Sequence, residues 1–332
     1  MPGDANGDGK VTINEVQKCI NQYLSIHPVD PCCDIDGNSQ VTIDEVQKVI
    51  NAFLGIVETI YENTTRSGHI YSNELWKGTI DITGDVIIHT PATVTIEPET
   101  TIRFAAGSDD QMHGGDTPIT DPYFPNDPPT PPSQMSSIYV MSGTLYAVGT
   151  SDSPIVFTSS ASNPERGDWQ SIQYGEGGGK LILQHTIIEY GYCGVQINVA
   201  ADDSNITLKD NVIRHIVACG ICGGIDPNQP VTITISGNDI SDCGHEAIDT
   251  HSNATLVIEN NILHDNLWSY GDGKAGAGVI IDGNNSTIRN NQFIRNRTAI
   301  AILTENSHPI ISGNSFVDND LDCDGFCPDP LQ

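Results

Sequence analysis

The chain has 332 residues, of which 43 are acidic and 14 basic, and its formal net charge is −29. A surface this negative repels phosphate groups, so we expect neither a nucleic acid nor an anionic lipid surface as a partner. No apolar run approaches the roughly 20 residues that a membrane span requires. The sequence also has no cationic start followed by an apolar stretch, so we expect no signal peptide in this chain.

The first predicted elements are two similar loops, DANGDGKVTINE at 4–15 and DIDGNSQVTIDE at 34–45. Positions 1, 3, 5, 7, 9 and 12 of each offer oxygen atoms, position 7 through its backbone carbonyl, and this is the spacing of an EF-hand loop. Hard oxygen ligands of about this number suit Ca²⁺. The predicted calcium ligands are Asp4, Asn6, Asp8, Lys10, Thr12 and Glu15 in the first loop, and Asp34, Asp36, Asn38, Gln40, Thr42 and Glu45 in the second.

The two loops differ at position 6, where an EF-hand loop makes a sharp turn. Gly9 occupies this position in the first loop and Ser39 in the second. A residue with a side chain is strained in such a turn, so we expect the first loop to bind Ca²⁺ more tightly. Because a module this small has little core to offset repulsion among its carboxylates, we also expect chelation to unfold it.

An amphipathic helix is predicted after each loop, with apolar residues four positions apart on one face. Gly55 is a good terminator for the second helix. The repeated order of loop then helix resembles a dockerin module over residues 1–56. The resemblance implies calcium-dependent docking to a cohesin-like protein, although dockerin loops usually close with Asp rather than with Glu. The predicted buried stripes are Val16, Ile20 and Leu24 in the first helix and Val46, Ile50 and Leu54 in the second.

Residues 57–332 contain short segments rich in Ile and Val between Asn, Gly, Asp and Ser. Five phrases of the form Asn, any residue, then Ile or Phe recur at intervals typical of stacked structural repeats. An asparagine at a fixed turn can bond to its copies in neighbouring coils and form a ladder. The predicted turn positions are His185, Asn211, Asn238, Asn260, Asn291 and Asn314, and the apolar residues two positions later are Ile187, Ile213, Ile240, Ile262, Phe293 and Phe316.

Coils with aligned apolar positions stack into one continuous column. The fold class predicted is therefore mainly β, a right-handed parallel β-helix over 57–332, preceded by a small all-α domain over 1–56. Residues 66–320 resemble secreted β-helix repeat proteins of pectate-lyase-like architecture, for example in SGTLYAVGTSDSPIVFTS at 142–159. This architecture carries lyases, hydrolases, epimerases and non-catalytic adhesins or matrix proteins, so the resemblance alone does not choose a function.

Residues 107–137 interrupt the coils with a segment rich in Pro, Asp and Gly. An insertion this long is usually functional or unstructured. Three interpretations stay open: a further calcium site on its aspartates, a contact for a partner through Tyr123 and Phe124, or a surface loop.

Two groups of residues are candidates for catalysis. The first lies four positions past successive turn anchors, where Glu189, His215, Asp242 and His264 fall in one predicted column. Stacked coils lie about 4.8 Å apart, so these side chains would reach one another and support acid–base chemistry. The alternative is a solvated turn. The second group belongs to CGHEAIDTH at 243–251, which offers His245, Glu246, Asp249 and His251.

Nine cysteines indicate an oxidising compartment. Cys193 and Cys219 lie eight positions past successive anchors, so a disulfide between stacked coils is predicted, with buried free thiols as the alternative. Cys323 and Cys327 are predicted to close a terminal loop. Cys19 is predicted to pair with Cys32 or Cys33.

After the last repeat, LDCDGFCPDPLQ is too short and too rich in Pro to form a capping helix. An open β-edge pairs readily with another chain, so we expect head-to-tail contact between copies, with a folded-back terminus as the alternative. The favoured function is a secreted, extracellular calcium-binding scaffold, adhesion or matrix component without catalysis. The first alternative is a polysaccharide lyase or glycoside hydrolase carried by the calcium module. The second is a module that binds an extracellular polysaccharide without turnover.

Overall fold

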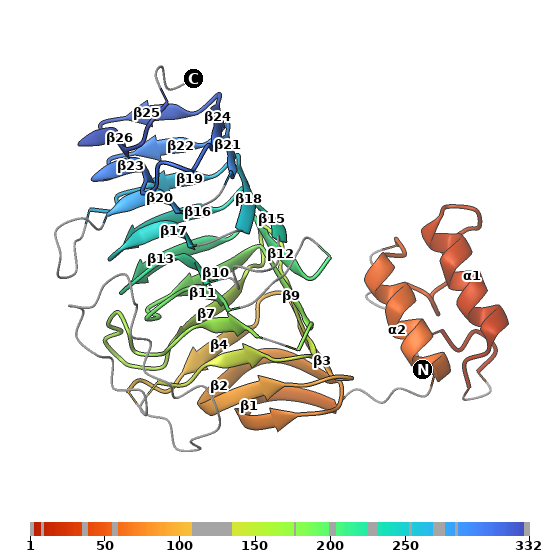
Figure 1. The fold of residues 1–332 in the computed structure, drawn as a ribbon. Coiled ribbons are helices and arrows are strands. Elements are labelled where there is room, and N and C mark those ends of the chain that lie inside the picture. Colours follow the sequence, from red (N-terminus) through yellow and green to blue (C-terminus); the bar gives the residue numbers. More distant parts are fainter. Residues whose placement is uncertain are drawn as a thin grey trace. The chain divides into compact units, whose positions relative to one another are not determined.

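The structure, a computed structural model, describes residues 3–7, 10–34, 39–54, 59–107, 135–175, 177–198, 204–224, 231–251, 254–267, 276–282 and 285–328. The chain divides into two compact units, Met1–Thr59 and Ile60–Gln332 (Figure 1). We call them the N-terminal unit and the C-terminal unit and describe each by itself. Among the described residues, neither helix has the length and apolar character needed to cross a membrane.

The N-terminal unit contains two helices, α1 (Ile13–Tyr23) and α2 (Ile43–Leu54), each directly after one of the two loops. The predicted stripe is correct at Val16 and Val46, which are buried, but wrong at Leu24 and Leu54, which are 56% and 59% exposed. A helix returns to the same face after three or four residues, and here the spacing of three places Cys19 and Val49 in the core. The buried apolar residues of this unit are Val11, Val16, Cys19, Cys33, Val41, Val46 and Val49.

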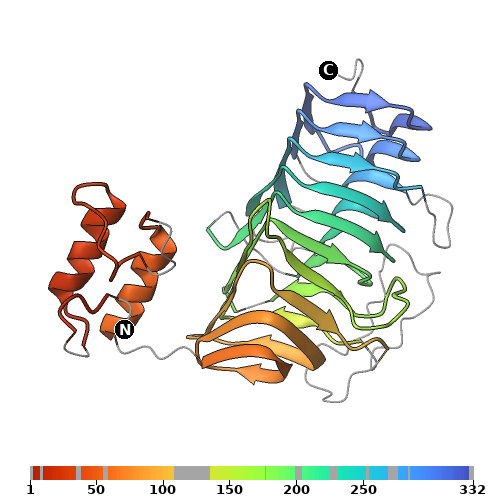
Figure 2. The same cartoon turned by 180° about the vertical axis from the view of Figure 1, so that it is seen from behind.

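The C-terminal unit consists of coils. Each coil contributes one strand to each of three parallel sheets (Figure 2). The long strand β2 (Glu74–Ile88) pairs with the first strand of all three, and β1 (Thr59–Ile70) pairs with β2.

The first sheet contains β3 (Thr93–Ile96), β6 (Thr144–Val148), β9 (Lys180–Gln184), β12 (Ile206–Lys209), β15 (Val231–Ser236), β18 (Ala254–Glu259), β21 (Thr287–Arg289) and β24 (Ile310–Ser312). The second contains β4 (Thr101–Phe104), β7 (Ile155–Ser159), β10 (Thr186–Glu189), β13 (Val212–Ile216), β16 (Asp239–Cys243), β19 (Ile262–His264), β22 (Gln292–Ile294) and β25 (Ser315–Val317). The third contains β5 (Ile138–Val140), β8 (Ile172–Tyr174), β11 (Val195–Ile197), β14 (Ile221–Gly224), β17 (Glu246–His251), β20 (Ala277–Asp282), β23 (Thr298–Ile302) and β26 (Leu321–Gly325).

An asparagine ladder lies at the turn from the first sheet to the second, as predicted. Asn238 accepts the backbone N–H of Asn211 at 3.0 Å and donates its side-chain N–H to Asn261 Oδ1 at 3.0 Å. Buried amides that satisfy one another in this way fix the register of every coil. The ladder positions are Thr186, Asn211, Asn238, Asn261, Asn291 and Asn314.

Two of the predicted anchors, His185 and Asn260, are therefore wrong by one residue. Each lies immediately before its ladder position, where the backbone has a positive φ of 50° and 57°, respectively. Glycine, asparagine and aspartate tolerate this conformation best, which explains why they are common at this turn. The left-handed turn residues are His185, Asp210, Gly237, Asn260, Asn290 and Gly313.

A second ladder, which the sequence analysis missed, lies at the turn that follows the second sheet. Asn266 accepts the N–H of Cys243 at 3.0 Å and donates to Asn296 Oδ1 at 2.9 Å, and Asn296 donates in turn to Asn319. The two ladders hold both ends of each strand of the second sheet in this part of the unit.

The core is one continuous column between the three sheets. In the second sheet its members include Ile188 and Leu263, both fully buried, instead of the predicted Ile187 and Ile262. The error follows from the misplaced anchors, since a shift of one residue moves a strand residue to the opposite face. The observed column is Ile188, Ile213, Ile240, Leu263, Phe293 and Phe316.

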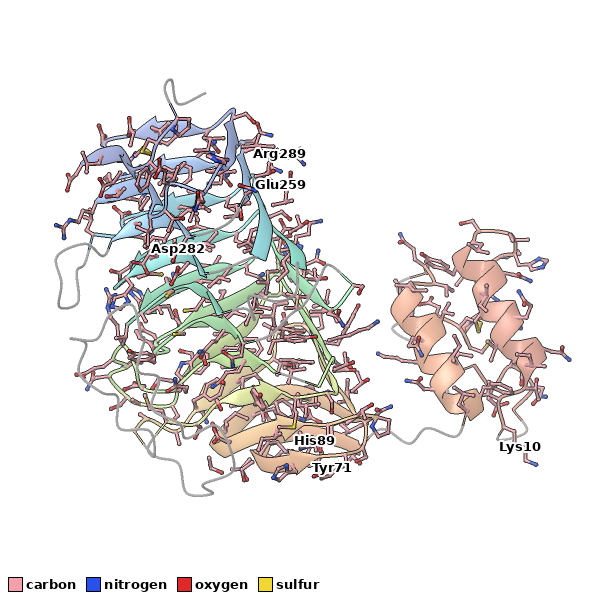
Figure 3. All side chains as sticks on the ribbon, in the orientation of Figure 1. Lys10, Tyr71, His89, Glu259, Asp282 and Arg289 are labelled. Carbon is pink, nitrogen blue, oxygen red and sulfur yellow. A yellow bond between two sulfur atoms is a disulfide. The ribbon has the colours of Figure 1, made fainter. Side chains whose placement is uncertain are left out.

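The last coil of the C-terminal unit has β24, β25 and β26, each paired on one side only among the described residues. Its apolar side chains include Ile310, Val317, Leu321 and Phe326, which are 63%, 42%, 50% and 52% exposed. At the other end of the same unit, Tyr71 stacks on His89 with ring centroids 4.6 Å apart (Figure 3).

Candidate functional site

The first predicted calcium loop is closed by Glu15. Its Oε1 accepts the backbone N–H of Ala5 at 2.9 Å, and its Oε2 accepts the N–H and the hydroxyl of Thr12, both at 2.8 Å. The side chain therefore joins the beginning of the loop to its end, and it is 7% exposed. The hydrogen bonds from Thr12 lower the pKa of Glu15, so the carboxylate stays charged. Asp4 accepts the N–H of Gly7 at 2.8 Å, and Asp8 lies outside the described residues.

The second loop repeats this arrangement. Glu45 Oε2 accepts the N–H and the hydroxyl of Thr42 at 2.7 and 2.9 Å, and Glu45 is 4% exposed. Asp34 accepts the N–H of Ser39 through Oδ2 at 2.9 Å, while its Oδ1 is buried and without a hydrogen bond in the described part of the chain. Ser39 has a φ of 69°, which confirms the strained turn expected there. Asp36 and Asn38 lie outside the described residues.

The other predicted ligands in the two loops are Asn6, Lys10 and Gln40. All three lie within the described residues, and each makes interactions of its own in the structure. The described donors of both loops are hard oxygen atoms, and the closing glutamate of each loop is buried. This donor set fits Ca²⁺.

The predicted catalytic column is brought together only in part. His215 lies beside Asp242, with 2.6 Å between Nδ1 and Oδ2. Glu189, however, is in register with Arg214, and His264 is in register with Ser241, so neither belongs to that column. The cause is again the misplacement of the anchors by one residue.

Residues with a positive φ occupy this position at the end of the second sheet. The conformation turns the chain sharply, so each of these side chains marks the end of a strand. The observed column is Tyr190, His215, Asp242, Asp265, Arg295 and Asp318.

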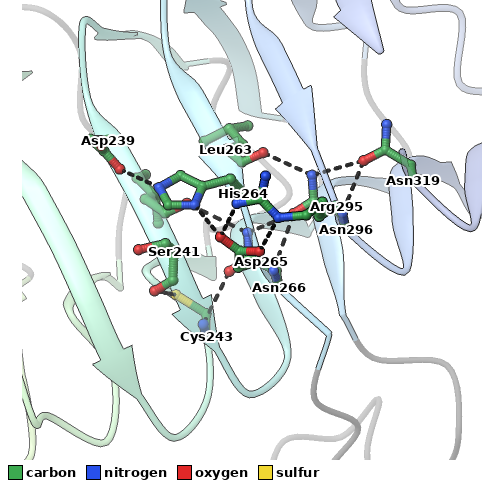
Figure 4. Close-up of polar contacts among 11 residues, drawn as sticks. Asp239, Ser241, Cys243, Leu263, His264, Asp265, Asn266, Arg295, Asn296 and Asn319 are labelled. Carbon is green, nitrogen blue, oxygen red and sulfur yellow. Dashed lines mark hydrogen bonds and ion pairs between the residues drawn. The ribbon is translucent and has the colours of Figure 1, made fainter. Parts of the chain in front are cut away.

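Ion pairs occupy this surface. Arg295 binds both oxygens of Asp265, at 2.7 and 2.6 Å, and His264 lies between Asp265 and Asp239 (Figure 4). The hydrogen bond from Arg295 and that from His264 lower the pKa of Asp265. A general acid near neutral pH requires the opposite shift from that of Asp265.

Other ion pairs join different coils. Glu189 pairs with Arg214 at 2.9 Å, and Asp242 pairs with Arg166. On the first sheet, Arg289 donates to Glu259 at 2.6 Å; both residues are labelled in Figure 3. These contacts join side chains of different coils.

The segment CGHEAIDTH is placed on and just before β17, and it forms a buried cluster with a residue that the sequence analysis did not associate with it. Cys219 Sγ lies 3.7 Å from Glu246 Oε2 and 3.9 Å from Asp249 Oδ2. Three residues each offer one ligand atom, and these three atoms lie within 4.8 Å of one another: Cys219, His245 and Glu246. His251 is in register with Asp282, and its side chain is outside the description.

The association was detectable in the sequence. The pairs Gly220-Ile221 and Ala247-Ile248 mark equivalent positions of neighbouring coils, and the preceding residues are Cys219 and Glu246. A hydrogen bond from Cys222 lowers the pKa of Cys219, but burial and the carboxylates of Asp249 and Glu246 raise it well above its usual value.

The predicted disulfide between Cys193 and Cys219 is wrong, because both cysteines are free thiols. They do lie in neighbouring coils and pack together with Ala218. Equivalent side chains of parallel strands point the same way, with Cβ atoms about 4.8 Å apart, whereas a disulfide brings the Cβ atoms to about 3.8 Å. The structure does contain the predicted bond between Cys323 and Cys327, and it pairs Cys19 with Cys33 rather than with Cys32.

The predicted insertion at 107–137 lies almost entirely outside the described residues, which resume at 135. The further calcium site proposed for its aspartates and the contact through Tyr123 and Phe124 fall in that part of the chain.

A family model described as right handed beta helix region matches residues 147–316, slightly more than half of the chain. No curated protein and no solved structure matches the chain. The matched residues contain the first ladder, the core column of the second sheet and most strands of the three parallel sheets described above. The chain therefore belongs to the right-handed β-helix family.

Proposed function

We propose that the protein is an extracellular, non-catalytic β-helix scaffold whose N-terminal unit is a calcium-dependent docking module. The observation that carries the proposal is the shared geometry of Glu15 and Glu45. Both carboxylates are almost fully buried, and both accept two hydrogen bonds from the threonine at position 9 of their loop. A repeated buried charge at the position where an EF-hand loop closes supports calcium binding.

The ligands in this proposal are those predicted from the two loops, including Asp4 and Glu15 in the first and Asp34 and Glu45 in the second. A bound Ca²⁺ would supply the positive charge that these carboxylates need when they are withdrawn from water. The residues of the chain would hold the loop closed around it, because Glu15 already connects Ala5 to Thr12.

A simpler role for the two glutamates is helix capping. Glu15 and Glu45 lie three residues after Thr12 and Thr42, and both pairs form the hydrogen bonds of a capping box. Glutamine is accepted in a capping box, but it removes the charge that binds calcium. The two roles are therefore separable by substitution.

The experiment is a calcium titration of the full chain and of the double variant Glu15→Gln, Glu45→Gln, followed by helical circular dichroism and thermal melting. We expect Ca²⁺ at about 100 times its dissociation constant to stabilise the N-terminal unit of the wild type by about 2.7 kcal/mol for each occupied loop. The variant should fold without calcium as well as the wild type does, but it should lose this gain. If chelation leaves the wild-type helical signal and its melting unchanged, calcium has no role in this unit.

The proposal of a role without catalysis is supported by the charge network of the second sheet, in which Glu189, Asp242 and Asp265 are paired with arginine or histidine. The enzyme alternative is tested by incubating the protein with polyuronides and neutral glycans in the presence of calcium. New reducing ends or unsaturated products would replace the scaffold proposal with a lyase or hydrolase. Binding without products would favour the glycan-binding alternative.

The partners that we propose are a cohesin-like protein for the N-terminal unit and a second copy of this chain for the last coil. The exposed apolar residues on β24, β25 and β26 and the one-sided pairing of these strands support the second partner. A head-to-tail contact at such an edge repeats into a filament unless it closes. Sedimentation should show concentration-dependent association that Leu321→Lys weakens, and a strictly monomeric wild type at high concentration would contradict it.

A further inference from the structure

A buried group of metal-ligand side chains lies on the outer face of the third sheet. Ile221 of β14 and Ile248 of β17 are paired and point into the core. Two residues before each of them, Cys219 and Glu246 are neighbours in successive coils. Cys219 packs in a separate apolar cluster rather than in the main core.

The donor atoms of this group lie at distances close to those around a metal ion. Cys219 Sγ is 3.7 Å from Glu246 Oε2 and 3.9 Å from Asp249 Oδ2, and His245 offers a ring nitrogen within 4.8 Å of Cys219 and Glu246. Tetrahedral bonds of about 2.0–2.3 Å place neighbouring ligand atoms about 3.3–3.8 Å apart. The two distances from Cys219 Sγ are close to this range, and the three atoms of Cys219, His245 and Glu246 lie within 4.8 Å of one another.

All four side chains are withdrawn from solvent. Cys219, His245, Glu246 and Asp249 are 4%, 2%, 0% and 3% exposed, respectively. A cation bound among these four side chains would therefore be shielded from water.

The types of donor atom indicate the class of metal. One sulfur, one nitrogen and two carboxylate groups form a mixed set that suits Zn²⁺ and related borderline cations, whereas Ca²⁺ requires oxygen ligands throughout. We propose that Cys219, His245, Glu246 and Asp249 form a buried, four-coordinate structural site for Zn²⁺. Binding would displace the proton of the Cys219 thiol into solvent.

The competing interpretation is that the protonated thiol donates weak hydrogen bonds to the two carboxylates. In that case the group fixes neighbouring coils without a metal. The two interpretations differ in whether a thiolate–metal bond forms, and cobalt reports this bond directly.

The test uses the full chain carrying Cys32→Ser, which removes the free thiol of the N-terminal unit, in excess Ca²⁺ to occupy oxygen-only sites. After metal removal, addition of Co²⁺ should produce the visible bands of tetrahedral cobalt and a thiolate charge-transfer band at one ion per chain. Zn²⁺ should displace the cobalt and abolish both signals. Excess Ca²⁺ should leave them unchanged.

Three variants assign the ligands. Cys219→Ser should abolish the charge-transfer band, and Glu246→Gln, which keeps the shape of the side chain, should lower cobalt affinity at least about tenfold. Cys193→Ala, one coil earlier at the equivalent position, should bind as the parent does. The circular dichroism of the β-helix confirms that each variant is folded. The absence of tetrahedral cobalt bands in the parent, or an unchanged charge-transfer band in folded Cys219→Ser, would overturn the proposal.

Discussion

The two units reach a folded state by different means. The N-terminal unit has a core of seven buried apolar residues, a disulfide, and loops whose buried carboxylates close the chain on itself. The C-terminal unit has one apolar column and two asparagine ladders in which each coil repeats the contacts of its neighbour. A small core needs a cross-link or an ion, whereas a repeating core gains stability with every added coil.

The sharpest way to separate the two units is to remove the disulfide of the smaller one. The chain separation of Cys19 and Cys33 is 14 residues, and a loop of about 15 residues gives about 3 kcal/mol of stabilisation. A unit of this size has only roughly 3–9 kcal/mol in total. Cys19→Ser should therefore abolish the helical circular dichroism at 37 °C while the β-helix melts as before. Cys32→Ser is the control and should change neither transition.

A cavity in the column tests the continuity of the larger unit. Ile188 is fully buried, whereas its neighbour Ile187 is only partly covered. Ile188→Ala should destabilise the C-terminal unit by about 2–5 kcal/mol, and Ile187→Ala by about 1 kcal/mol or less. Denaturant unfolding monitored by β-sheet circular dichroism measures both. Equal effects would mean that the register of β10 is wrong.

The ladder is tested by two adjacent asparagines. Asn261 Oδ1 accepts from the backbone and from the side chain of Asn238, so Asn261→Ala leaves buried donors without an acceptor and should cost about 2–3 kcal/mol. Asn260 has a positive φ that glycine adopts freely, so Asn260→Gly should change the free energy of unfolding by less than about 0.5 kcal/mol. A larger loss of stability in Asn260→Gly than in Asn261→Ala would mean that Asn260, and not Asn261, is the ladder residue.

The smallest predicted effect is on how the melting temperature of the C-terminal unit depends on pH. The pKa of Asp265 is lowered by Arg295, so the pair stabilises the fold above the unfolded pKa of about 3.9 and is lost as the pH falls through the lower folded value. Arg295→Gln should lower the melting temperature slightly at pH 7 and not at all once Asp265 is protonated in both proteins. Melting curves from pH 7 to pH 2 measure this difference. A loss that persists at pH 2 would mean that Arg295 acts through packing.

The two units also differ in how far the sequence predicts them. The repeat of Val, Ile and Asn predicted the coils, the ladder and four of its asparagines because these positions recur at nearly regular intervals. It failed at HT (185–186) and NN (260–261), where two adjacent residues fit the same pattern and only the hydrogen bonds distinguish them. The helices after the calcium-type loops were predicted from periodicity, but the choice between Cys19 and Leu24 for burial depends on how the helices pack.

The buried cluster shows what a one-dimensional pattern leaves out. The equivalence of Cys219 and Glu246 is contained in the repeat, since each precedes a small residue and an isoleucine. The repeat does not predict that these two side chains are buried, because outward positions of a β-helix are solvated unless another segment covers them. The predicted disulfide failed for a related reason, since stacking aligns two cysteines without bringing their sulfur atoms together.

The two asparagine ladders run in the same direction. In both, the oxygen of each side-chain amide receives hydrogen bonds from the preceding coil. Its nitrogen donates both to the next amide of the ladder and to a backbone carbonyl of the preceding coil. The carbonyl groups of these amides therefore all point the same way along the coils that the ladders join, as the peptide carbonyls do along a helix.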